Sequence, residues 1–481
     1  MKKVVIIGAG PAGLTTAYKL LKDKEKYDVT VLELENQVGG ICRTINYNGN
    51  RMDLGGHRFF TKSEEINKLW EEVMPKVDTP TSDKDKVFLT RNRLSRIYFN
   101  KKFFDYPVSL SLDTIKKMGF VNTMKVGFSY LASRFRKLDE SNLENFYINR
   151  FGRKLYSMFF EGYTEKLWGR HPSIISADWG SQRVKGLSIT KVLVSAMKKV
   201  LRIKDKHVET SLIDSFYYPK HGPGEYFEEM AKDIKSMGGK LLLNTRVESI
   251  NVKNNKVVSV KANGNEYKCD YLVSTMPIKE LCRMLPNNKK VLSISDNLPY
   301  RDFMTIGVIL KKTNIKLEDT WIYVQEPNIK MGRIQVFNNW SPYLVKDKNT
   351  ISLGLEYFAS EGDEYWTMKD KDFKDLAMSE LEDMGIASKE DLLDYHVERV
   401  KKAYPAYFDS YKDIDKVISY LDKFDNLYCV GRNGMHRYNN MDHSMLAGIE
   451  CYKNIKGLST KKNIWNINTE KEYHEETNKR N

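Results

Sequence analysis

Residues 4–14 read VVIIGAGPAGL, and this stretch decides the fold. Its first four residues form a short apolar run that is typical of a buried strand. Gly8, Gly10 and Gly13 follow in the spacing G-x-G-x-x-G, and apolar residues continue at helical spacing through residues 14–21. Glycines in this order permit a tight turn, a close approach of the backbone to a pyrophosphate, and close packing of helix on strand. The stretch therefore predicts the first strand, turn and helix of a dinucleotide-binding domain.

The next segment supports this interpretation. Residues 28–33 read DVTVLE, a second strand that ends in an acid, and Glu33 lies 20 residues after Gly13. An acid at this distance accepts hydrogen bonds from a ribose hydroxyl, while the unpaired N–H groups at the helix start stabilise phosphate charge. Ala12 lies in the same helix start, and we include it in the predicted cofactor site.

The choice of dinucleotide depends on residues 33–44, which read ELENQVGGICRT. A second glycine pair that includes Gly40 is followed here by Arg43. This extension resembles the one that lines the FAD pyrophosphate in flavoproteins and that NAD-only domains generally lack. The segment favours FAD over NAD.

Composition places the chain among globular proteins. It has 481 residues, of which 41% are apolar and 29% charged, enough for more than one packed domain. No run approaches 18 uncharged apolar residues, so we expect no transmembrane helix. The N-terminus enters a strand at once, which argues against a secretory signal. Five scattered cysteines without a CxxC motif argue against a disulfide framework or a metal site and favour a reducing, cytoplasmic location.

The formal net charge of +15 suits an anionic partner. The densest basic stretch, residues 198–207, lacks the interleaved aromatic residues of a nucleic-acid groove, so we expect no nucleic-acid binding. An anionic small molecule is the better explanation, and peripheral contact with a membrane stays open. The oligomeric state is not indicated.

The order of predicted elements indicates an α/β protein in which the nucleotide domain is assembled from separate pieces. We expect a Rossmann-like FAD-binding domain, a βαβ unit with a three-stranded meander, carrying inserted helical and antiparallel-sheet substrate regions. The predicted parts are an FAD domain of residues 1–60, 210–295 and 425–456, a mainly helical region 61–209, an antiparallel region 296–424 and a polar tail 457–481.

Motifs in these segments are similar to those of the UDP-galactopyranose mutase family, which lies within the flavoprotein superfamily of amine oxidases and protoporphyrinogen oxidase. The similarity runs from residue 3 to about residue 455. The motifs that carry it are DLGGH at 53–57, KFFDYP at 102–107, YTEKLWG at 163–169, WGSQRV at 179–184, YPKHGPG at 218–224, RIQVFNNWSPY at 333–343, and the closing segment at 431–444.

The resemblance implies a set of site residues. Its diphosphate-binding arginines and tyrosines match Arg183, Arg333, Tyr323, Tyr404 and Tyr438, and Tyr106 lies in the substrate-pocket hairpin. Arginine suits this role because its planar fork pairs with phosphate oxygens and stays charged. The resemblance makes His57, Arg183 and Arg333 the catalytic candidates, with His57 beside the flavin. The further cofactor-binding residues that it implies are Gly40, Arg43, Gly56, His57, Val247, Gly431, Arg432, Asp442, His443 and Ser444.

The function that the resemblance implies is interconversion of the pyranose and furanose forms of a nucleotide-diphosphate sugar. In that reaction N5 of the reduced flavin attacks the anomeric carbon, and NADPH or NADH is a possible external reductant. Residues 108–110 read VSL where the family usually has an aromatic residue and an amide that hold the uracil, so the nucleotide stays open. An alternative is an FAD-dependent oxidoreductase that transfers hydride from an amine, porphyrin or polyene to the flavin.

Overall fold

The computed structural model describes residues 1–77, 79–81, 84–106, 108, 112–177, 179–180, 215–286 and 288–468. The chain forms two compact units. Unit 1 comprises Met1–Thr90, Tyr217–Arg301 and Val400–Glu472, and unit 2 comprises Arg91–Phe216, Asp302–Arg399 and Tyr473–Asn481. The finer domain boundaries that we expected from the sequence stay a prediction.

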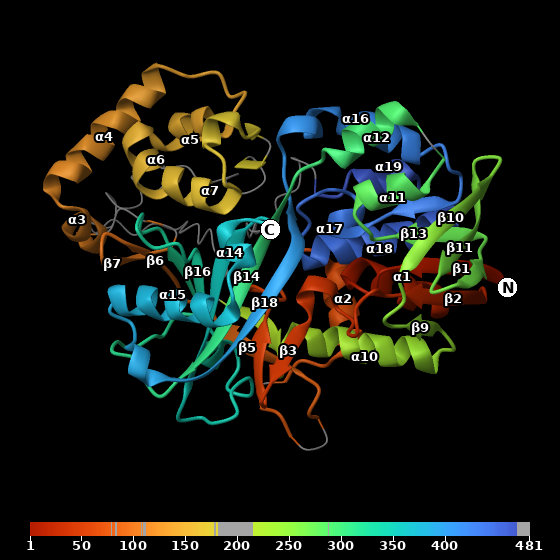
Figure 1. The fold of residues 1–481 in the computed structure, drawn as a ribbon, viewed down its shortest axis with the longest axis horizontal. Coiled ribbons are helices and arrows are strands. Elements are labelled where there is room, and N and C mark those ends of the chain that lie inside the picture. The colour runs from red at the N-terminus through yellow and green to blue at the C-terminus, as the bar shows by residue number, and fades with distance from the viewer. Residues whose placement is uncertain are drawn as a thin grey trace, which may run out of the picture. The chain divides into compact units, whose positions relative to one another are not determined.

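Unit 1 is built on a five-stranded parallel sheet in the order β19-β13-β1-β2-β9. Its strands are β1 (Lys2–Ile7), β2 (Tyr27–Leu32), β9 (Lys240–Leu242), β13 (Tyr271–Ser274) and β19 (Leu427–Cys429). The inner strands are apolar runs because both faces of a parallel sheet are covered. Among the covering helices, α1 (Pro11–Leu21) packs against α10 (Pro223–Ser236) and α18 (Met441–Ile455) (Figure 1).

The meander that we expected in this unit is present. It consists of β10 (Val247–Lys253), β11 (Lys256–Ala262) and β12 (Asn265–Lys268), with antiparallel pairing throughout. The other elements that lie wholly within unit 1 are η1 (Gly40–Cys42), β3 (Thr44–Tyr47), β4 (Asn50–Asp53), α2 (Glu64–Val73), α11 (Ile278–Met284), α12 (Lys289–Asp296), η4 (Asp409–Asp413), α16 (Ile414–Leu421), α17 (Gly431–Gly434) and α19 (Lys461–Trp465).

Unit 2 contains a seven-stranded sheet in the order β18-β14-β17-β16-β15-β6-β7. Its strands are β6 (Ser95–Phe99), β7 (Lys102–Asp105), β14 (Tyr300–Leu310), β15 (Trp321–Val324), β16 (Arg333–Val336), β17 (Ile351–Ala359) and β18 (Leu392–Pro405), of which β14 and β18 also contribute residues to unit 1. Two further sheets of the described residues are two-stranded. One pairs β3 with β4 in unit 1, and the other pairs β5 (Phe88–Asn92) with β8 (Ser215–Pro219). One face of the large sheet is apolar and packs against α15 (Asp370–Asp383) through side chains that include Ile334, Leu355 and Phe373.

The helices of unit 2 include α3 (Leu112–Met118), α4 (Phe120–Phe135), α5 (Leu143–Phe151), α6 (Arg153–Phe159) and α7 (Glu161–Trp168), which form one group in Figure 1. Its shorter helices are η2 (Pro172–Ile174), α13 (Phe337–Trp340), α14 (Glu364–Thr367) and η3 (Lys389–Asp391).

The predicted α/β fold class is confirmed, with one refinement. We expected an antiparallel sheet from residues 296–424 alone, but the β6–β7 hairpin joins it and β6 runs parallel to β15. A parallel neighbour is possible here because β6 comes from a distant part of the chain, so no tight hairpin is needed. No helix in the described residues is long and apolar enough to cross a membrane.

Candidate functional site

The glycine loop of unit 1 leaves space for a ligand where the sequence predicted a pyrophosphate. A Cβ atom added to Gly13 would lie 2.0 Å from the carbonyl oxygen of Gly8. Only glycine therefore allows the helix to pack this closely against the loop after β1. Gly10 and Gly40 differ, because a Cβ on Gly10 would meet nothing nearer than 3.9 Å, and that atom is the Cα of Gly40. The two glycines thus face each other, and a Cβ on either one would have only the backbone of the other within 4 Å, its own chain neighbours aside. Such a cradle fits a diphosphate that approaches main-chain N–H groups.

The first turn of α1 carries no acidic side chain. The N-cap of the helix is Gly10, which makes no side-chain cap. The N-terminal end of a helix carries partial positive charge and unpaired N–H groups. The phosphates of a dinucleotide would satisfy those groups, which fits the predicted roles of Gly8, Gly10, Ala12 and Gly13.

Glu33 lies at the end of β2 and holds the loop in shape. Its carboxylate accepts hydrogen bonds from the backbone N–H of Ala9 at 2.6 Å and of Glu35 at 2.9 Å. Burial raises the pKa of Glu33, and these two N–H donors oppose the rise. A carboxylate offers about four acceptor positions. Glu33 therefore keeps acceptor capacity for a ribose hydroxyl while it orders the loop.

The second glycine loop is tied to the first. Gly39 donates its N–H to the carbonyl of Ala9 at 2.8 Å, and the Arg43 guanidinium donates to the carbonyl of Gly40 at 3.1 Å. Gly39 has a φ of 101°, which favours glycine. Gly40 and Arg43 therefore lie beside the loop of Gly8 and Gly10, and their contact with a cofactor stays a prediction.

His57 lies in unit 1 close enough to Arg432 to feel its charge. Burial, with a smaller contribution from the charge of Arg432, lowers the pKa of His57 to about 3, and a hydrogen bond with the backbone of Gly55 opposes the fall. The Nδ1 atom of His57 is sealed from solvent and has no hydrogen-bond partner among the described residues. His57 is therefore a neutral imidazole with an unused polar atom. It fits a hydrogen bond to a cofactor ring, and it does not fit the role of a cation.

Arg432 is held by its own unit. It donates to the carbonyl oxygens of Asn439 at 2.8 Å and Ala403 at 3.0 Å, and its guanidinium lies 4.7 Å from the ring centre of Tyr438. Tyr438 in turn stacks on Tyr404, with ring centroids 5.7 Å apart. Two predicted substrate tyrosines and one predicted cofactor residue are thus brought together.

The remaining cofactor candidates lie in unit 1, most of them at the starts of helices or strands. A Cβ on Gly431, at the start of α17, would lie 3.0 Å from the Cβ of Ala12, so α17 begins beside α1. Asp442, His443 and Ser444 are buried in the first turn of α18. Val247 begins β10, and Gly56 lies in the loop after β4. The structure assigns no contact from these residues to a cofactor.

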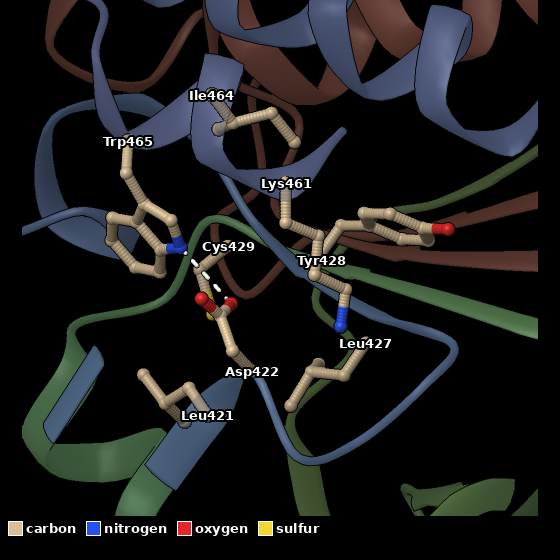
Figure 2. A pocket seen from close by; sticks show the side chains of 8 residues that line it. All are labelled: Leu421, Asp422, Leu427, Tyr428, Cys429, Lys461, Ile464 and Trp465. Atoms are coloured by element: carbon tan, nitrogen blue, oxygen red, sulfur yellow. Dashed lines mark hydrogen bonds between the residues drawn. The ribbon is translucent and has the colours of Figure 1, made fainter. Parts of the chain in front are cut away.

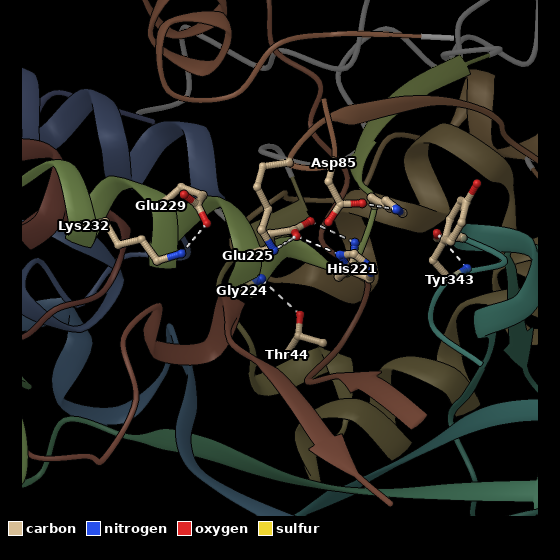
Figure 3. Close-up of polar contacts among 11 residues, drawn as sticks. Thr44, Asp85, His221, Gly224, Glu225, Glu229, Lys232 and Tyr343 are labelled. Carbon is tan, nitrogen blue, oxygen red and sulfur yellow. Dashed lines mark hydrogen bonds and ion pairs between the residues drawn. The ribbon is translucent and has the colours of Figure 1, made fainter. Parts of the chain in front are cut away.

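The DLGGH motif contains a buried acid, Asp53, that we did not predict as a site residue. Asp53 is fully buried, and it accepts hydrogen bonds from the hydroxyls of Tyr218 and of Thr44, the latter at 2.9 Å. Burial raises the pKa of Asp53 to about 7, although both hydroxyls oppose the rise. Thr44 also accepts from the N–H of Gly224 at 3.0 Å (Figure 3). The YPKHGPG turn is thereby fixed to β3 and β4.

Glu225 completes that turn. Its carboxylate pairs with Nδ1 of His221 at 2.8 Å (Figure 3). It also accepts a hydrogen bond from Nζ of Lys86 at 2.8 Å. Burial opposes ionisation, but these partners together lower the pKa of Glu225. The contact with His221 lies at the turn itself, which gives His221 a structural role, and the contact with Lys86 ties the turn to the segment before β5.

A second polar cluster lies on one face of the large sheet of unit 2. The strand register pairs Tyr323 with Arg333 and Arg333 with Glu356. Residues directly opposite in neighbouring strands share a face. The three side chains therefore form a row across β15, β16 and β17, on the face opposite the apolar core against α15.

Arg333 is buried at the centre of this row. Its guanidinium donates to the hydroxyl of Tyr163 at 2.7 Å and to the Glu356 carboxylate at 3.1 Å. The guanidinium carbon lies 4.8 Å from the ring centre of Phe358. Burial raises the pKa of Glu356, and the charge of Arg333 opposes the rise. The predicted diphosphate-binding arginine is thus already paired with a carboxylate, which the sequence did not reveal.

Several buried polar atoms near Arg333 have no hydrogen-bond partner among the described residues. They are Nε2 of Gln335, Nε1 of Trp321 and Oε1 of Glu356. Trp321 and Gln335 are opposite each other in the β15–β16 register. Buried polar atoms are ordinarily paired, so an unpaired group of donors and an acceptor indicates a place for a polar ligand. This cluster, which we call the polar row, consists of Tyr323, Arg333, Glu356, Trp321 and Gln335.

Aromatic rings border the polar row. The ring of Tyr106 lies 4.6 Å from that of Tyr323, and the ring of Tyr163 lies 5.9 Å from Tyr323 on another side. The structure thus brings together Tyr106, Tyr323 and Arg333 of the predicted substrate site. Arg183 lies outside the described residues. Sequence reasoning missed Tyr163, Glu356 and Gln335 as site residues. Tyr163 and Gln335 stand in motifs that we quoted, whereas Glu356 lies outside them.

Three other features of the described residues give less support for a functional site. The cavity between β19 and α19 measures about 10 Å³, which is room for about one water. Its lining includes Cys429, Lys461 and Trp465 (Figure 2). Lys166 has a pKa that burial lowers to about 8, but its three hydrogen bonds all go to backbone carbonyls, so it is structural. The described residues hold no group of metal-ligating side chains.

Comparisons with known proteins agree on a flavoprotein fold. The family described as "Flavin containing amine oxidoreductase" matches residues 11–449. Coproporphyrinogen III oxidase of Staphylococcus aureus is 23% identical over 257 residues, 52% of this chain and 55% of that protein. The chain thus spans about half the length of this relative. Mitochondrial protoporphyrinogen oxidase of Nicotiana tabacum is 22% identical over 469 residues, 91% of each chain.

Solved structures are similar over nearly the full length. The structure of a reduced UDP-galactopyranose mutase has a TM-score of 0.81 and 23% identity, covering 98% of this chain and 99% of the other. A putative protoporphyrinogen oxidase from Exiguobacterium sp. 255-15 has a TM-score of 0.72 and 16% identity, covering 95% and 98%. At these identities the likeness establishes the fold.

Proposed function

The chain belongs to the flavin-containing amine oxidoreductase family, and on that premise we propose that it is an FAD-dependent mutase for a nucleotide-diphosphate sugar. The reaction would interconvert the pyranose and furanose forms of the sugar. The observation that carries the proposal is the polar row of unit 2. A buried arginine and a set of unpaired donors and acceptors suit a substrate with phosphates and hydroxyls.

The cofactor is FAD by this proposal, held by unit 1. The backbone between Gly10 and Gly40 and the start of α1 would hold its diphosphate, and Glu33 would accept from a ribose hydroxyl. When bound and reduced, FAD supplies the nucleophile for the anomeric carbon, and NADH or NADPH would be the electron donor. His57 would face the cofactor as a neutral ring and offer Nδ1 for a hydrogen bond.

The substrate diphosphate would be recognised by Arg333 together with Tyr323, Tyr163 and Tyr106. Because Glu356 already pairs with Arg333, an incoming phosphate competes with this carboxylate for the guanidinium. The raised pKa of Glu356 allows the acid to take up a proton and release the arginine to the phosphate. The leaving diphosphate gains negative charge as the glycosidic bond breaks, and a guanidinium stabilises that charge. Arg183, Tyr404 and Tyr438 complete the proposed substrate set.

The test is product formation by the reduced protein. We expect dithionite-reduced, flavin-loaded protein to convert UDP-galactopyranose, or a member of a dTDP-hexose panel, into a furanose that chromatography separates. The Arg333→Met variant should keep its flavin and lose conversion. No furanose from any nucleotide sugar tested would exclude the mutase reaction.

The nucleotide can be identified separately. The segment 108–110 does not match the uracil pocket of the mutases, so the base is not specified. Protection against heat by a scan of nucleoside diphosphates should reveal a preference. Equal protection by all of them would place recognition in the diphosphate alone.

A second candidate is an oxidoreductase that transfers hydride to the flavin. It is favoured by the names of the relatives, which are oxidases of porphyrinogens. This reaction predicts that substrate bleaches the flavin in the absence of dithionite and that air then restores the colour with release of peroxide. The mutase reaction predicts neither.

The five buried free cysteines suit a reducing compartment, and we propose the cytoplasm.

A further inference from the structure

The helix α4 exposes an apolar stripe that the proposed function does not use. Six large apolar side chains on this helix are between 44% and 90% exposed in the described part of the chain. They are Phe120, Val121, Met124, Phe128, Leu131 and Phe135. Exposed apolar side chains that stand singly are normal, but a contiguous group marks a contact surface.

The six side chains lie on one side of the helix. At about 100° per residue they fall within an arc of about 100°, and the stripe is about 22 Å long. The opposite side of α4 is the one that packs, through Val126, Tyr130 and Ser133, which are buried. The helices α5 and α6 contact α4 (Figure 1). The apolar stripe therefore points away from the helices that hold α4 in place.

Positive charge borders the stripe on both sides. Lys125 and Arg134 are exposed, and each lies about 90° from the middle of the stripe around the helix. Residues 114–138 contain six basic residues and no acidic one, although Lys117 pairs with Asp113 just outside this segment. An exposed apolar stripe between basic flanks is the pattern of a helix that lies in the interface of an anionic membrane.

We propose that α4 docks this protein on the surface of an anionic lipid bilayer, with the stripe in the acyl boundary and the basic flanks at the head groups. The helix has 16 residues, and no helix in the described residues is long and apolar enough to cross a membrane, so α4 would lie flat. A second copy of the chain fits less well, because a symmetric contact would bring the basic flanks of both copies together. The proposal does not depend on which reaction the protein catalyses.

The test is co-sedimentation of the flavin-loaded, full-length protein with vesicles. We expect binding to vesicles of phosphatidylcholine with about one third phosphatidylglycerol, and at least about tenfold weaker binding to pure phosphatidylcholine or in high salt. The triple variant Phe120→Ser, Phe128→Ser, Phe135→Ser should lose at least about tenfold in binding. The double variant Ile174→Ser, Leu458→Ser, which removes exposed apolar residues elsewhere, should bind like the wild type.

Charge reversal tests the flanks. Lys125→Glu with Arg134→Glu should abolish the preference for anionic vesicles, whereas Lys253→Glu with Lys268→Glu on the meander should not. These positions are exposed, so the variants should keep wild-type flavin content and mutase or oxidase activity. That control separates failure of this proposal from failure of the proposed function.

A label reports the depth of the stripe. The five native cysteines are buried, so Met124→Cys offers a single surface thiol for an environment-sensitive dye. Its emission should shift to the blue on addition of anionic vesicles, and that of Ile174→Cys should not. The proposal is overturned if the wild type fails to sediment with anionic vesicles at low salt. It is equally overturned if light scattering shows a dimer that the triple variant breaks, with no lipid binding by either protein.

Discussion

The parallel sheet of unit 1 and the large sheet of unit 2 place polar groups in opposite ways. In unit 1 the strands are apolar on both faces, and the cradle forms beyond their ends, where Gly8, Gly10 and Gly40 expose backbone. In unit 2 only one face is apolar, and Arg333 and Glu356 lie in the middle of the other face. A backbone cradle suits a phosphate of any nucleotide, whereas a row of side chains can select a substrate.

Each unit also buries an acid, with different partners. Asp53 is held by the hydroxyls of Tyr218 and Thr44, and Glu356 is held by the guanidinium of Arg333. The two hydroxyls bring no positive charge to balance a buried carboxylate. Burial therefore favours the protonated form of Asp53. An arginine keeps its charge, so removal of Glu356 strands a buried cation. The following variants test this contrast, in order of expected effect.

The largest effect should come from Gly13→Ala in unit 1. The new Cβ would meet the Gly8 carbonyl oxygen at 2.0 Å, in a place where backbone cannot yield. We expect protein that is misfolded or colourless, measured as flavin absorbance per mole of protein. The matched control is Gly162→Ala on α7, where a Cβ meets nothing within 4 Å, and it should stay yellow. A yellow Gly13→Ala protein would show that the cradle does not depend on this packing.

The next effect should come from Glu356→Ala in unit 2. It leaves Arg333 buried without its carboxylate, at a cost of about 3–5 kcal/mol in the free energy of unfolding. Arg333→Ala should cost less, because burial lets Glu356 protonate. Thermal and urea unfolding of both variants and of the double variant would measure the coupling. Glu318→Ala, in an exposed ion pair with Lys316, should not measurably change stability.

Asp53→Asn should change the pH dependence of the free energy of unfolding, and we expect this effect to be smaller than the loss of stability in Glu356→Ala. The pKa of Asp53 is raised to about 7, so the folded protein holds one more proton than the unfolded chain between about pH 4 and pH 7. Stability contributed by this group therefore falls as pH rises through that window. Relative to wild type, the variant should gain up to about 4 kcal/mol between pH 4 and pH 8 in urea unfolding of flavin-free protein. A constant difference across this range would mean that Asp53 is ionised throughout.

The smallest effect should come from Tyr323→Phe, which removes only a hydroxyl from the polar row. We expect a KM for the nucleotide sugar that rises by about threefold to tenfold, with flavin content unchanged. Tyr98→Phe is the control on the opposite face, where the hydroxyl donates to the Met384 carbonyl at 3.3 Å, and it should change stability and leave KM alone. An unchanged KM for Tyr323→Phe would remove this residue from the substrate site.

The sequence was most informative where function depends on neighbours in the chain. The loop from Gly8 to Gly13 and the acid Glu33 were identified from their spacing, and Gly40 and Arg43 from their resemblance to the FAD extension of flavoproteins. The structure brings these residues together. Local spacing suffices there because glycine loops and helix starts are set by a few consecutive residues. Tyr106, Tyr323 and Arg333 were identified by resemblance to a family, and they also lie together.

The partners of those residues came only from the tertiary structure. Strand register places Glu356 opposite Arg333, and helix α7 brings the Tyr163 hydroxyl to the same guanidinium. No local pattern in the sequence predicts a contact between residues so far apart in the chain. The apolar residues of α4 give the same lesson, because helical spacing alone predicts a core face there. The fold instead buries Val126 and Tyr130 and leaves Phe120, Phe128 and Phe135 outside. The sequence by itself determined the main secondary-structure elements and the cofactor loop. Only the tertiary structure decided which charges pair and which apolar faces stay exposed, because the burial of a residue depends on which distant parts of the chain pack against it.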